Sequence, residues 1–246
     1  MGRFLSNDRE NKDRTPRTIV VGDIHGCYRE AEALISGLQE KGKYIPETDR
    51  LIFIGDYIDR GDNPRLAVKY VRGLQEKYGD KVIALKGNHE DMMQDHLLCG
   101  DRNWTYNGND PTLRSYQGHK EDFENDLLWI DSLPLYYEDD YFIYVHAGID
   151  KDKPMDQQLD DTLLWARQEF YGDPRAYGKK VVFGHTPTLA LGEGPTPLWF
   201  NDGNDIDIDT GCVFGGKLTA LIIEKDQVVE YHQVNRERGI RKFFRK

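Results

Sequence analysis

Residues 51–61 read LIFIGDYIDRG, an apolar run that ends at a glycine and is followed by two carboxylates. A continuous apolar run of this length is typical of a short strand buried on both faces. Gly55 permits a sharp turn directly after such a strand, because glycine adopts backbone conformations that other residues avoid. We therefore expect Asp56 and Asp59 to lie at the carboxyl end of a buried strand.

Four other apolar runs end in the same manner. They lead into GDIHG (22–26), GNHE (87–90), HAG (146–148) and GHT (184–186). In open α/β sheets, ligands bind beyond the carboxyl ends of the strands. A capping Asp would explain one such turn, but five turns that each place Asp, Asn or His beside glycine indicate one shared polar site. The five predicted strands are Thr18–Val21, Leu51–Ile54, Val82–Leu85, Tyr141–Val145 and Val181–Phe183.

Segments with helical spacing lie between these strands. The early alternation of strands and helices predicts the α/β class. Three later strands, at 206–209, 218–224 and 227–233, have hairpin character, with a turn at 225–226. This order predicts two stacked β-sheets with helices outside them. The apolar helical stripes are Ala31, Leu34, Ile35 and Leu38; Ala67, Tyr70, Val71 and Leu74; and Leu159, Leu163, Ala166 and Phe170.

The composition is that of a globular protein. The chain has 246 residues, a formal net charge of −10 and 31% charged residues, and it has no apolar run near the roughly 18–20 residues of a membrane helix. The number of cysteines, three, is odd, and their spacing is not that of metal ligands. Both observations favour reduced thiols in the cytoplasm over disulfides. We expect a flexible leader (1–16), one catalytic domain (17–235) with an irregular insertion at about 100–120, and a basic C-terminal tail (236–246).

The signatures GDxHG, GDxxDRG and GNHE occur here in this order. In this respect the chain resembles the calcineurin-like metallophosphoesterases. More narrowly, it resembles the phosphoprotein phosphatase family of Ser/Thr phosphatases, in its short bacterial and phage form, over residues 18–223. The resemblance implies the calcineurin-like fold, a four-layer αββα sandwich of two mixed β-sheets flanked by helices.

The resemblance also implies a centre of two divalent metal ions. Such ions, roughly 3.5–4 Å apart, clamp both the attacking and the leaving oxygen of an in-line displacement. All the implied ligands are nitrogen or oxygen atoms, which suits Mn, Fe, Zn or Mg, and the bacterial relatives favour Mn²⁺. The implied ligands are Asp23, His25 and Asp56 for the first ion, and Asp56, Asn88, His146 and His185 for the second.

The catalytic roles that the resemblance implies fall on the same turns. A hydroxide that bridges the two metals would attack phosphorus, and His89 would protonate the leaving oxygen. Asp59 would accept a hydrogen bond from His89 and fix its orientation. Arg60 and Arg167 would bind the phosphate together with Asn88, because a guanidinium fork matches two phosphoryl oxygens.

Three functions are compatible with this pattern. The main expectation is a Ser/Thr protein phosphatase that acts on phosphorylated proteins or peptides. It is favoured by Asp59, which the symmetrical tetraphosphate hydrolases of enteric type lack. The first alternative is a hydrolase of dinucleoside polyphosphates such as diadenosine tetraphosphate, whose members share the Ala147 form of the HAG turn. The second is a non-catalytic phosphate-binding module on the same fold. We expect neither membrane association nor specific nucleic-acid binding.

Overall fold

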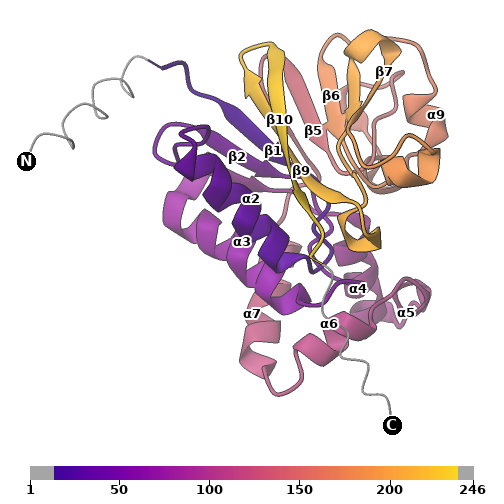
Figure 1. Ribbon diagram of the computed structural model, residues 1–246. Helices are drawn as coiled ribbons and strands as arrows, with labels where there is room; N and C mark the ends of the chain where they lie inside the picture. Colours follow the sequence, from indigo (N-terminus) through magenta and orange to yellow (C-terminus); the bar gives the residue numbers. More distant parts are fainter. Residues whose placement is uncertain (1–13, 238–246) are drawn as a thin grey trace, which may run out of the picture.

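The computed structural model describes residues 14–237 (Figure 1). Most of the predicted leader (1–16) and of the predicted basic tail (236–246) therefore lies outside the described residues. At the described ends, Arg14 pairs with the buried Asp49, and Arg236 pairs with the buried Glu30 at 2.8 Å. Within this range, no helix has the length and apolarity needed to cross a bilayer.

The first sheet contains five strands in the order β10-β9-β1-β2-β3. Strands β1, β2 and β3 are parallel, with Val20 opposite Ile52, so their carboxyl ends meet at one edge. Strand β9 runs antiparallel to β1 and forms a hairpin with β10 across the predicted turn at 225–226. The bounds are β1 (Thr18–Val21), β2 (Arg50–Phe53), β3 (Val82–Ala84), β9 (Lys217–Glu224) and β10 (Gln227–Asn235).

The second sheet has the order β4-β5-β6-β8-β7. Its central strands β5, β6 and β8 are parallel, and the edge strands β4 and β7 pair with them in antiparallel fashion. The sequence pattern did not predict β4 and β7, which are three residues long and only partly buried. The bounds are β4 (Tyr136–Glu138), β5 (Phe142–Val145), β6 (Lys180–Phe183), β7 (Leu198–Phe200) and β8 (Asp205–Asp207).

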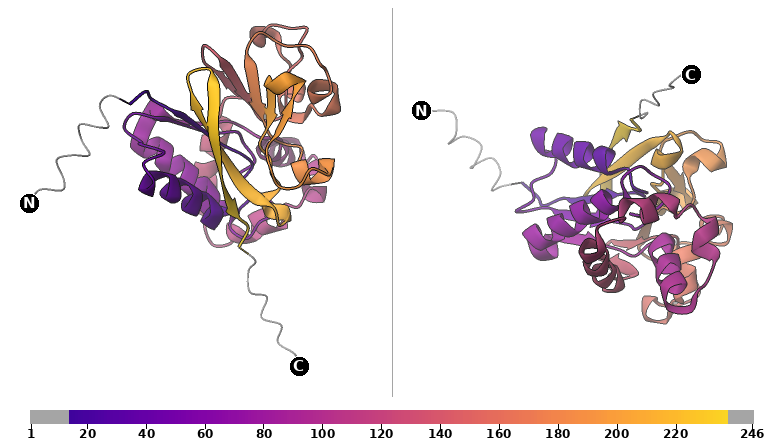
Figure 2. Two further views of the ribbon diagram at one scale, coloured as in Figure 1. Left: turned by 45° about the horizontal axis from the view of Figure 1, so that its top comes forward. Right: turned by 90° about the horizontal axis from the view of Figure 1, so that it is seen from below.

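The two sheets pack face to face with helices outside them, which confirms the predicted fold class (Figures 1 and 2). Alternate residues of β1 show the layering. Val20 points into the core between the sheets, and Ile19 and Val21 point into the core under the helices. Helices α2 (Tyr28–Glu40) and α3 (Pro64–Tyr78) cover the first sheet, and α4 (Asn88–Cys99) and α7 (Lys120–Asp131) extend this layer.

The third predicted helical stripe is split between two short helices, α8 (Asp160–Trp165) and α9 (Gln168–Tyr171), which cover the second sheet. The helix is interrupted between them, because Ala166 (φ −54°, ψ 142°) and Arg167 (φ −134°, ψ −123°) both have non-helical backbone angles. Leu163, Ala166 and Phe170 still share one core, so the apolar spacing survives the break.

The segment 100–120 also contains regular structure where we expected an irregular insertion. Its helices are α5 (Asn103–Tyr106) and α6 (Asp110–Ser115). Five 3-10 turns complete the described elements: η1 (Gly79–Lys81), η2 (Met155–Gln157), η3 (Thr188–Leu191), η4 (Asn201–Gly203) and η5 (Cys212–Phe214).

Candidate active site at the carboxyl ends of the strands

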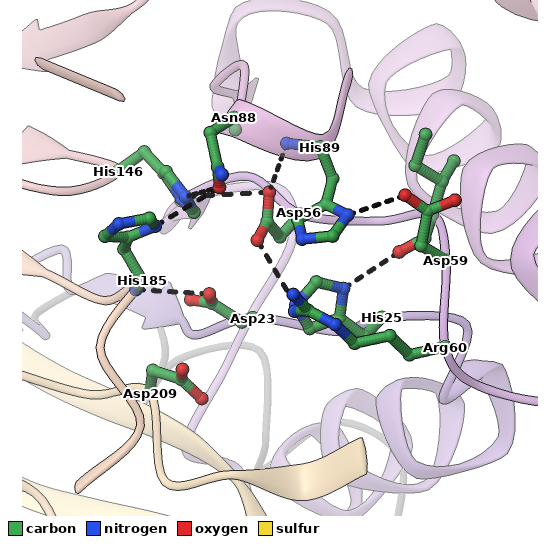
Figure 3. A network of polar contacts seen from close by, with 12 residues as sticks. Asp23, His25, Asp56, Asp59, Arg60, Asn88, His89, His146, His185 and Asp209 are labelled. Atoms are coloured by element: carbon green, nitrogen blue, oxygen red, sulfur yellow. Dashed lines mark hydrogen bonds and ion pairs between the residues drawn. The ribbon is translucent and has the colours of Figure 1, made fainter. Parts of the chain in front are cut away.

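The six predicted metal ligands meet where the parallel strands of both sheets end (Figure 3). Each is at most 7% exposed. Within residues 14–237, two groups of ligand atoms, each within 4.8 Å, share Asp56: one adds His25 and His89, and the other adds Asp23 and His146, whereas His185 belongs to neither group. His89 thus lies among the candidate ligands, although the sequence suggested proton transfer for it. The six predicted ligands are Asp23, His25, Asp56, Asn88, His146 and His185.

The turns that carry these ligands are held in strained backbone conformations. His25, Asp56 and His185 have φ values of +43°, +53° and +67°, in the left-handed region that residues other than glycine rarely adopt. Each such residue costs on the order of 1–3 kcal/mol, and strain of this kind gathers at ligand sites, where the surroundings impose it.

Glu90 holds the Asp56 turn in place, a role that the sequence analysis missed. The carboxylate accepts four backbone N–H bonds: from Asp56 (2.9 Å), Tyr57 (2.8 Å), Ile58 (3.1 Å) and Gly87 (3.0 Å). Burial and the nearby Asp56 raise the pKa of Glu90 to about 8. Each of its oxygens faces two N–H donors, however, which leaves no room for a proton. We therefore treat the buried Glu90 as a carboxylate.

The contacts of His146 fit a cation better than they fit a hydrogen-bond network. Its Nδ1 lies 3.0 Å from the Ile54 carbonyl, so this nitrogen carries the proton. Its Nε2 lone pair then faces the oxygens of Asn88 at 2.9 Å and Asp56 at 3.5 Å. Burial lowers the pKa of His146, which disfavours a second proton. A cation bound between these atoms would be stabilised by all three of them.

Asp23 and His185 offer further unused ligand atoms. Asp23 Oδ1 and His185 Nε2 are buried and have no hydrogen-bond partner in the part of the chain that the structure describes. The backbone N–H of His185 donates to Asp23 Oδ2 at 3.1 Å, so this bond links the turn after β1 to the turn after β6. Burial, aided by His146 and Arg167, lowers the pKa of His185 to about 2. The ring is therefore neutral. Its Nδ1 lies 3.2 Å from Asn88 Oδ1, so this nitrogen is on the side of the other candidate ligands (Figure 3).

Two more buried acids, Asp207 and Asp209, lie close to Asp23 and were missed as part of the site. Burial and Asp209 raise the pKa of Asp23 well above its usual range. Burial likewise raises the pKa of Asp209 to about 6. The pKa of Asp56 lies well below its usual range. Burial alone would raise it, but the nearby His146, His89 and His25 together outweigh that effect. Bound cations would offset this concentration of carboxylates.

His89 and Asp59 form the pair that the sequence predicted. His89 Nδ1 lies 2.6 Å from Asp59 Oδ2, and the His89 backbone N–H donates to Asp56 Oδ1 at 3.0 Å (Figure 3). Burial lowers the pKa of His89. Because Nδ1 contacts Asp59, Nε2 is the ring nitrogen of His89 that remains for another contact.

The two predicted phosphate-binding arginines lie beside different ligands. Arg60 places Nη1 2.6 Å from His25 Nε2, and its guanidinium packs 5.5 Å from the ring centre of Phe214. Arg167 is exposed and donates to Thr186 Oγ1 at 3.0 Å, next to His185. The site thus carries a guanidinium on its His25 side and another on its His185 side.

The sequence profile of the calcineurin-like phosphoesterases matches residues 16–235. The chain belongs to the calcineurin-like phosphoesterase family. Members of this family use a divalent metal centre, and the clusters around Asp56 provide the candidate ligand groups.

Several relatives in this family carry names. Bis(5'-nucleosyl)-tetraphosphatase PrpE (asymmetrical) of Geobacillus thermodenitrificans is 31% identical over 229 residues. The protein of the same name from Bacillus subtilis is 31% identical over 227 residues. Each alignment covers 82% of this chain and 88% of the relative.

Solved structures share the fold across different activities. A candidate diadenosine tetraphosphatase has a TM-score of 0.62 at 19% identity, over 92% of this chain and 96% of its own. A Saccharomyces cerevisiae protein serine/threonine phosphatase has a TM-score of 0.59 at 17% identity, over 94% of this chain and 82% of its own. At these identities the likeness shows the fold alone.

The relatives overturn the expectation of a Ser/Thr protein phosphatase, because proteins that are 29–31% identical over most of both chains are named as tetraphosphatases. The error has a physical cause. The residues that contact metal and phosphorus serve both substrate classes, so they do not report what lies beyond the scissile bond. The presence of Asp59 is evidence only against the symmetrical tetraphosphate hydrolases, whereas the named relatives are asymmetrical tetraphosphatases. The presence of Ala147 favoured the tetraphosphate hydrolases.

Proposed function

We propose that the protein is a metal-dependent hydrolase of bis(5'-nucleosyl) tetraphosphates. It would cut the phosphate chain asymmetrically, giving a nucleoside triphosphate and a nucleoside monophosphate. The observation that carries the proposal is the similarity to named asymmetrical tetraphosphatases at 31% identity over most of both chains. We further propose residues 17–235 as the single catalytic unit, in keeping with the family match over 16–235.

The proposed metal ligands are the six buried side chains around Asp56. Their unpartnered atoms and facing lone pairs fit divalent cations. When bound, two such ions supply Lewis-acid activation of water and neutralise charge on the phosphoryl oxygens. The donors are all nitrogen or oxygen, which suits Mn, Fe, Zn and Mg alike. Mn²⁺ is the proposed ion because of the resemblance to bacterial phosphatases and not because of the ligand types. The proposed ligands are Asp23, His25, Asp56, Asn88, His146 and His185.

Arg60, Arg167 and Asn88 are the proposed contacts to the phosphate chain. A tetraphosphate carries several negative charges along its length, and a guanidinium stays charged at working pH. Because the two arginines lie beside His25 and His185, they would contact phosphates on two sides of the reacting phosphorus. The exposed Arg167 donates one N–H to Thr186, and its other donors would serve the phosphate chain.

His89 is the proposed proton donor to the leaving oxygen, and Asp59 the residue that orients it. The Asp59 contact fixes Nδ1–H, so a proton would pass through Nε2. A nucleoside phosphate leaving group has a pKa of roughly 6, far below that of a serine hydroxyl. Departure of a phosphate therefore needs less help from an acid, which suits a histidine whose pKa is lowered by burial.

The test is product analysis with diadenosine tetraphosphate and Mn²⁺. Nucleotides separated by ion-exchange chromatography should be ATP and AMP in equal amounts from the first turnover onwards. A chelator should stop the reaction, and Asp56→Asn, which weakens the shared ligand, should lower kcat/KM by at least about 10³-fold.

A matched assay with a phosphoserine peptide separates the two substrate classes. The proposal predicts a kcat/KM at least tenfold lower for the peptide. ADP as the sole nucleotide product would contradict asymmetrical cleavage. Phosphate release from the peptide without hydrolysis of the dinucleotide would overturn the proposed substrate class.

A further inference from the structure

Asp59 is held by more than its contact with His89. Its Oδ2 accepts a hydrogen bond from the Trp104 indole Nε1 at 2.8 Å, besides the His89 contact at 2.6 Å. Asp59 Oδ1 accepts a hydrogen bond from the Thr112 hydroxyl at 2.6 Å. The backbone N–H of Asp59 donates to the same hydroxyl oxygen at 2.9 Å. Both oxygens of the carboxylate are therefore fixed from outside the motif that contains it.

These contacts are shielded from water. Trp104, Thr112 and Asp59 are each 0% exposed, and His89 is 1% exposed. A hydrogen bond to a buried carboxylate is stronger than one in water, since no solvent competes for the same atoms. Asp59 also has a left-handed φ of +69°, so its side-chain direction depends on support from its neighbours.

The support comes from the segment that was expected to be an irregular insertion. Trp104 lies in α5 and Thr112 in α6. Between them, the Gly108 carbonyl accepts the N–H of Arg60 at 3.0 Å. One short segment therefore contacts two consecutive residues of the GDxxDRG motif, Asp59 and Arg60.

We propose that Trp104 and Thr112 are positioning residues that act on catalysis through Asp59. They fix the rotation of the Asp59 carboxylate, and the carboxylate in turn fixes the ring of His89. Without the Thr112 hydroxyl, Oδ1 would lose its hydrogen-bond donor and the carboxylate would rotate to find another. His89 would then lose the direction in which Nε2 faces the substrate.

This inference rests on the proposed role of His89, so the test begins there. Phenyl phosphate and p-nitrophenyl phosphate undergo the same reaction with a poor and a good leaving group. His89→Asn should lower kcat much more for phenyl phosphate than for p-nitrophenyl phosphate. An equal loss on both would refute the acid role of His89 itself, and the inference with it.

The matched pair of variants is Thr112→Val and Thr112→Ser. Valine keeps the shape and removes the hydroxyl, whereas serine keeps the hydroxyl. We expect Thr112→Val to lower kcat on phenyl phosphate by about 10–100-fold with KM unchanged, and to have little effect on p-nitrophenyl phosphate. Thr112→Ser should restore most of the rate. The nuclear magnetic resonance signal of the His89 Nδ1–H proton should shift in the valine variant and return in the serine variant.

Trp104→Phe provides an independent test, because it removes the indole N–H and keeps an aromatic ring. It should show the same dependence on the leaving group, with a smaller loss, since the other oxygen of Asp59 remains held. The inference fails if folded Thr112→Val and Trp104→Phe lose rate equally on both substrates while His89→Asn discriminates between them. It also fails if neither variant changes kcat, or if serine and valine at position 112 behave alike.

Discussion

Glu90 binds no metal in our assignment, yet it determines where Asp56 lies. Four backbone N–H groups donate to its buried carboxylate. Glu90→Gln would set an amide NH₂ against some of these donors, and hydrogen bonds to charged groups are worth about 1.5–3 kcal/mol each. We expect a loss of unfolding free energy on the order of 3 kcal/mol and weaker Mn²⁺ binding, measured by urea denaturation and calorimetry.

Glu124→Gln is the matched control for this substitution. The Glu124 side chain is 60% exposed in α7 and, among residues 14–237, pairs only with Lys120 of the same helix. Its change in stability should stay within about 0.5 kcal/mol. If Glu90→Gln were equally mild, Glu90 would be protonated in the native protein and our view of the Asp56 turn would be wrong.

Gly184 leaves the space that Asp23 occupies. A Cβ atom at this position would lie 2.2 Å from Asp23 Oδ1 and 3.0 Å from Ile54 Cδ1. We therefore expect Gly184→Ala to displace the Asp23 carboxylate and weaken Mn²⁺ binding at least about tenfold by calorimetry. Gly37→Ala in α2, where among the described residues the added Cβ meets no atom within 4 Å apart from its chain neighbours and its own helix backbone, should leave metal binding unchanged. Equal affinities in the two variants would exclude Asp23 as a ligand.

At the scale of elements, the sequence predicted what depends on local pattern. The five buried strands and the turns after them follow from short apolar runs that end at glycine. Helix α7 also has a local pattern, because Phe123, Leu127 and Ile130 lie at helical spacing, although it is not among the three predicted stripes. The bonds from Trp104 and Thr112 to Asp59 span 45 and 53 residues, and no local pattern reports contacts at such separations.

Lys151 links β8 to the segment that follows β5. Its Nζ lies 2.7 Å from Asp205 Oδ2, and these side chains are 2% and 1% exposed. Lys151→Met would leave Asp205 buried without its cation, which costs about 3–5 kcal/mol. Lys153→Met, in which the lost lysine is 39% exposed, should cost under about 1 kcal/mol. Urea denaturation of the two variants tests this prediction.

The loss in Lys151→Met should depend on pH with a definite sign. Burial already raises the pKa of Asp205, and removal of Lys151 would raise it further. A carboxyl group with a higher pKa in the folded state binds more protons when folded, so it destabilises the protein as the pH rises through that range. The variant should therefore lose less stability at pH 5 than at pH 8, and a larger loss at pH 5 would contradict the buried-pair explanation.

At the scale of the whole molecule, the site joins the two sheets. Asp23, His25, Asp56 and Asn88 follow strands of the first sheet, and His146 and His185 follow strands of the second. Ions bound between them would link the sheets. The sequence predicted this convergence because parallel strands expose their carboxyl ends at one edge, whereas substrate identity depends on surfaces beyond the metals and was predicted wrongly.

Metal removal should therefore lower the stability of the whole domain. At a free Mn²⁺ concentration of 100 times Kd, one ion stabilises the folded state by about 2.7 kcal/mol. For a domain of this size, that corresponds to a rise in Tm of roughly 5–10 °C. Differential scanning calorimetry with Mn²⁺ and with a chelator should show this difference in the wild-type protein. Asp56→Asn should show little or none, and equal shifts in both proteins would place the stabilising ion elsewhere.

The most direct measurement is anomalous X-ray diffraction from crystals grown with Mn²⁺, collected at the manganese edge. The account predicts two anomalous peaks, both within coordination distance of the Asp56 carboxylate, with the other ligands divided between them. A site without anomalous density, or ions that do not contact Asp56, would contradict it.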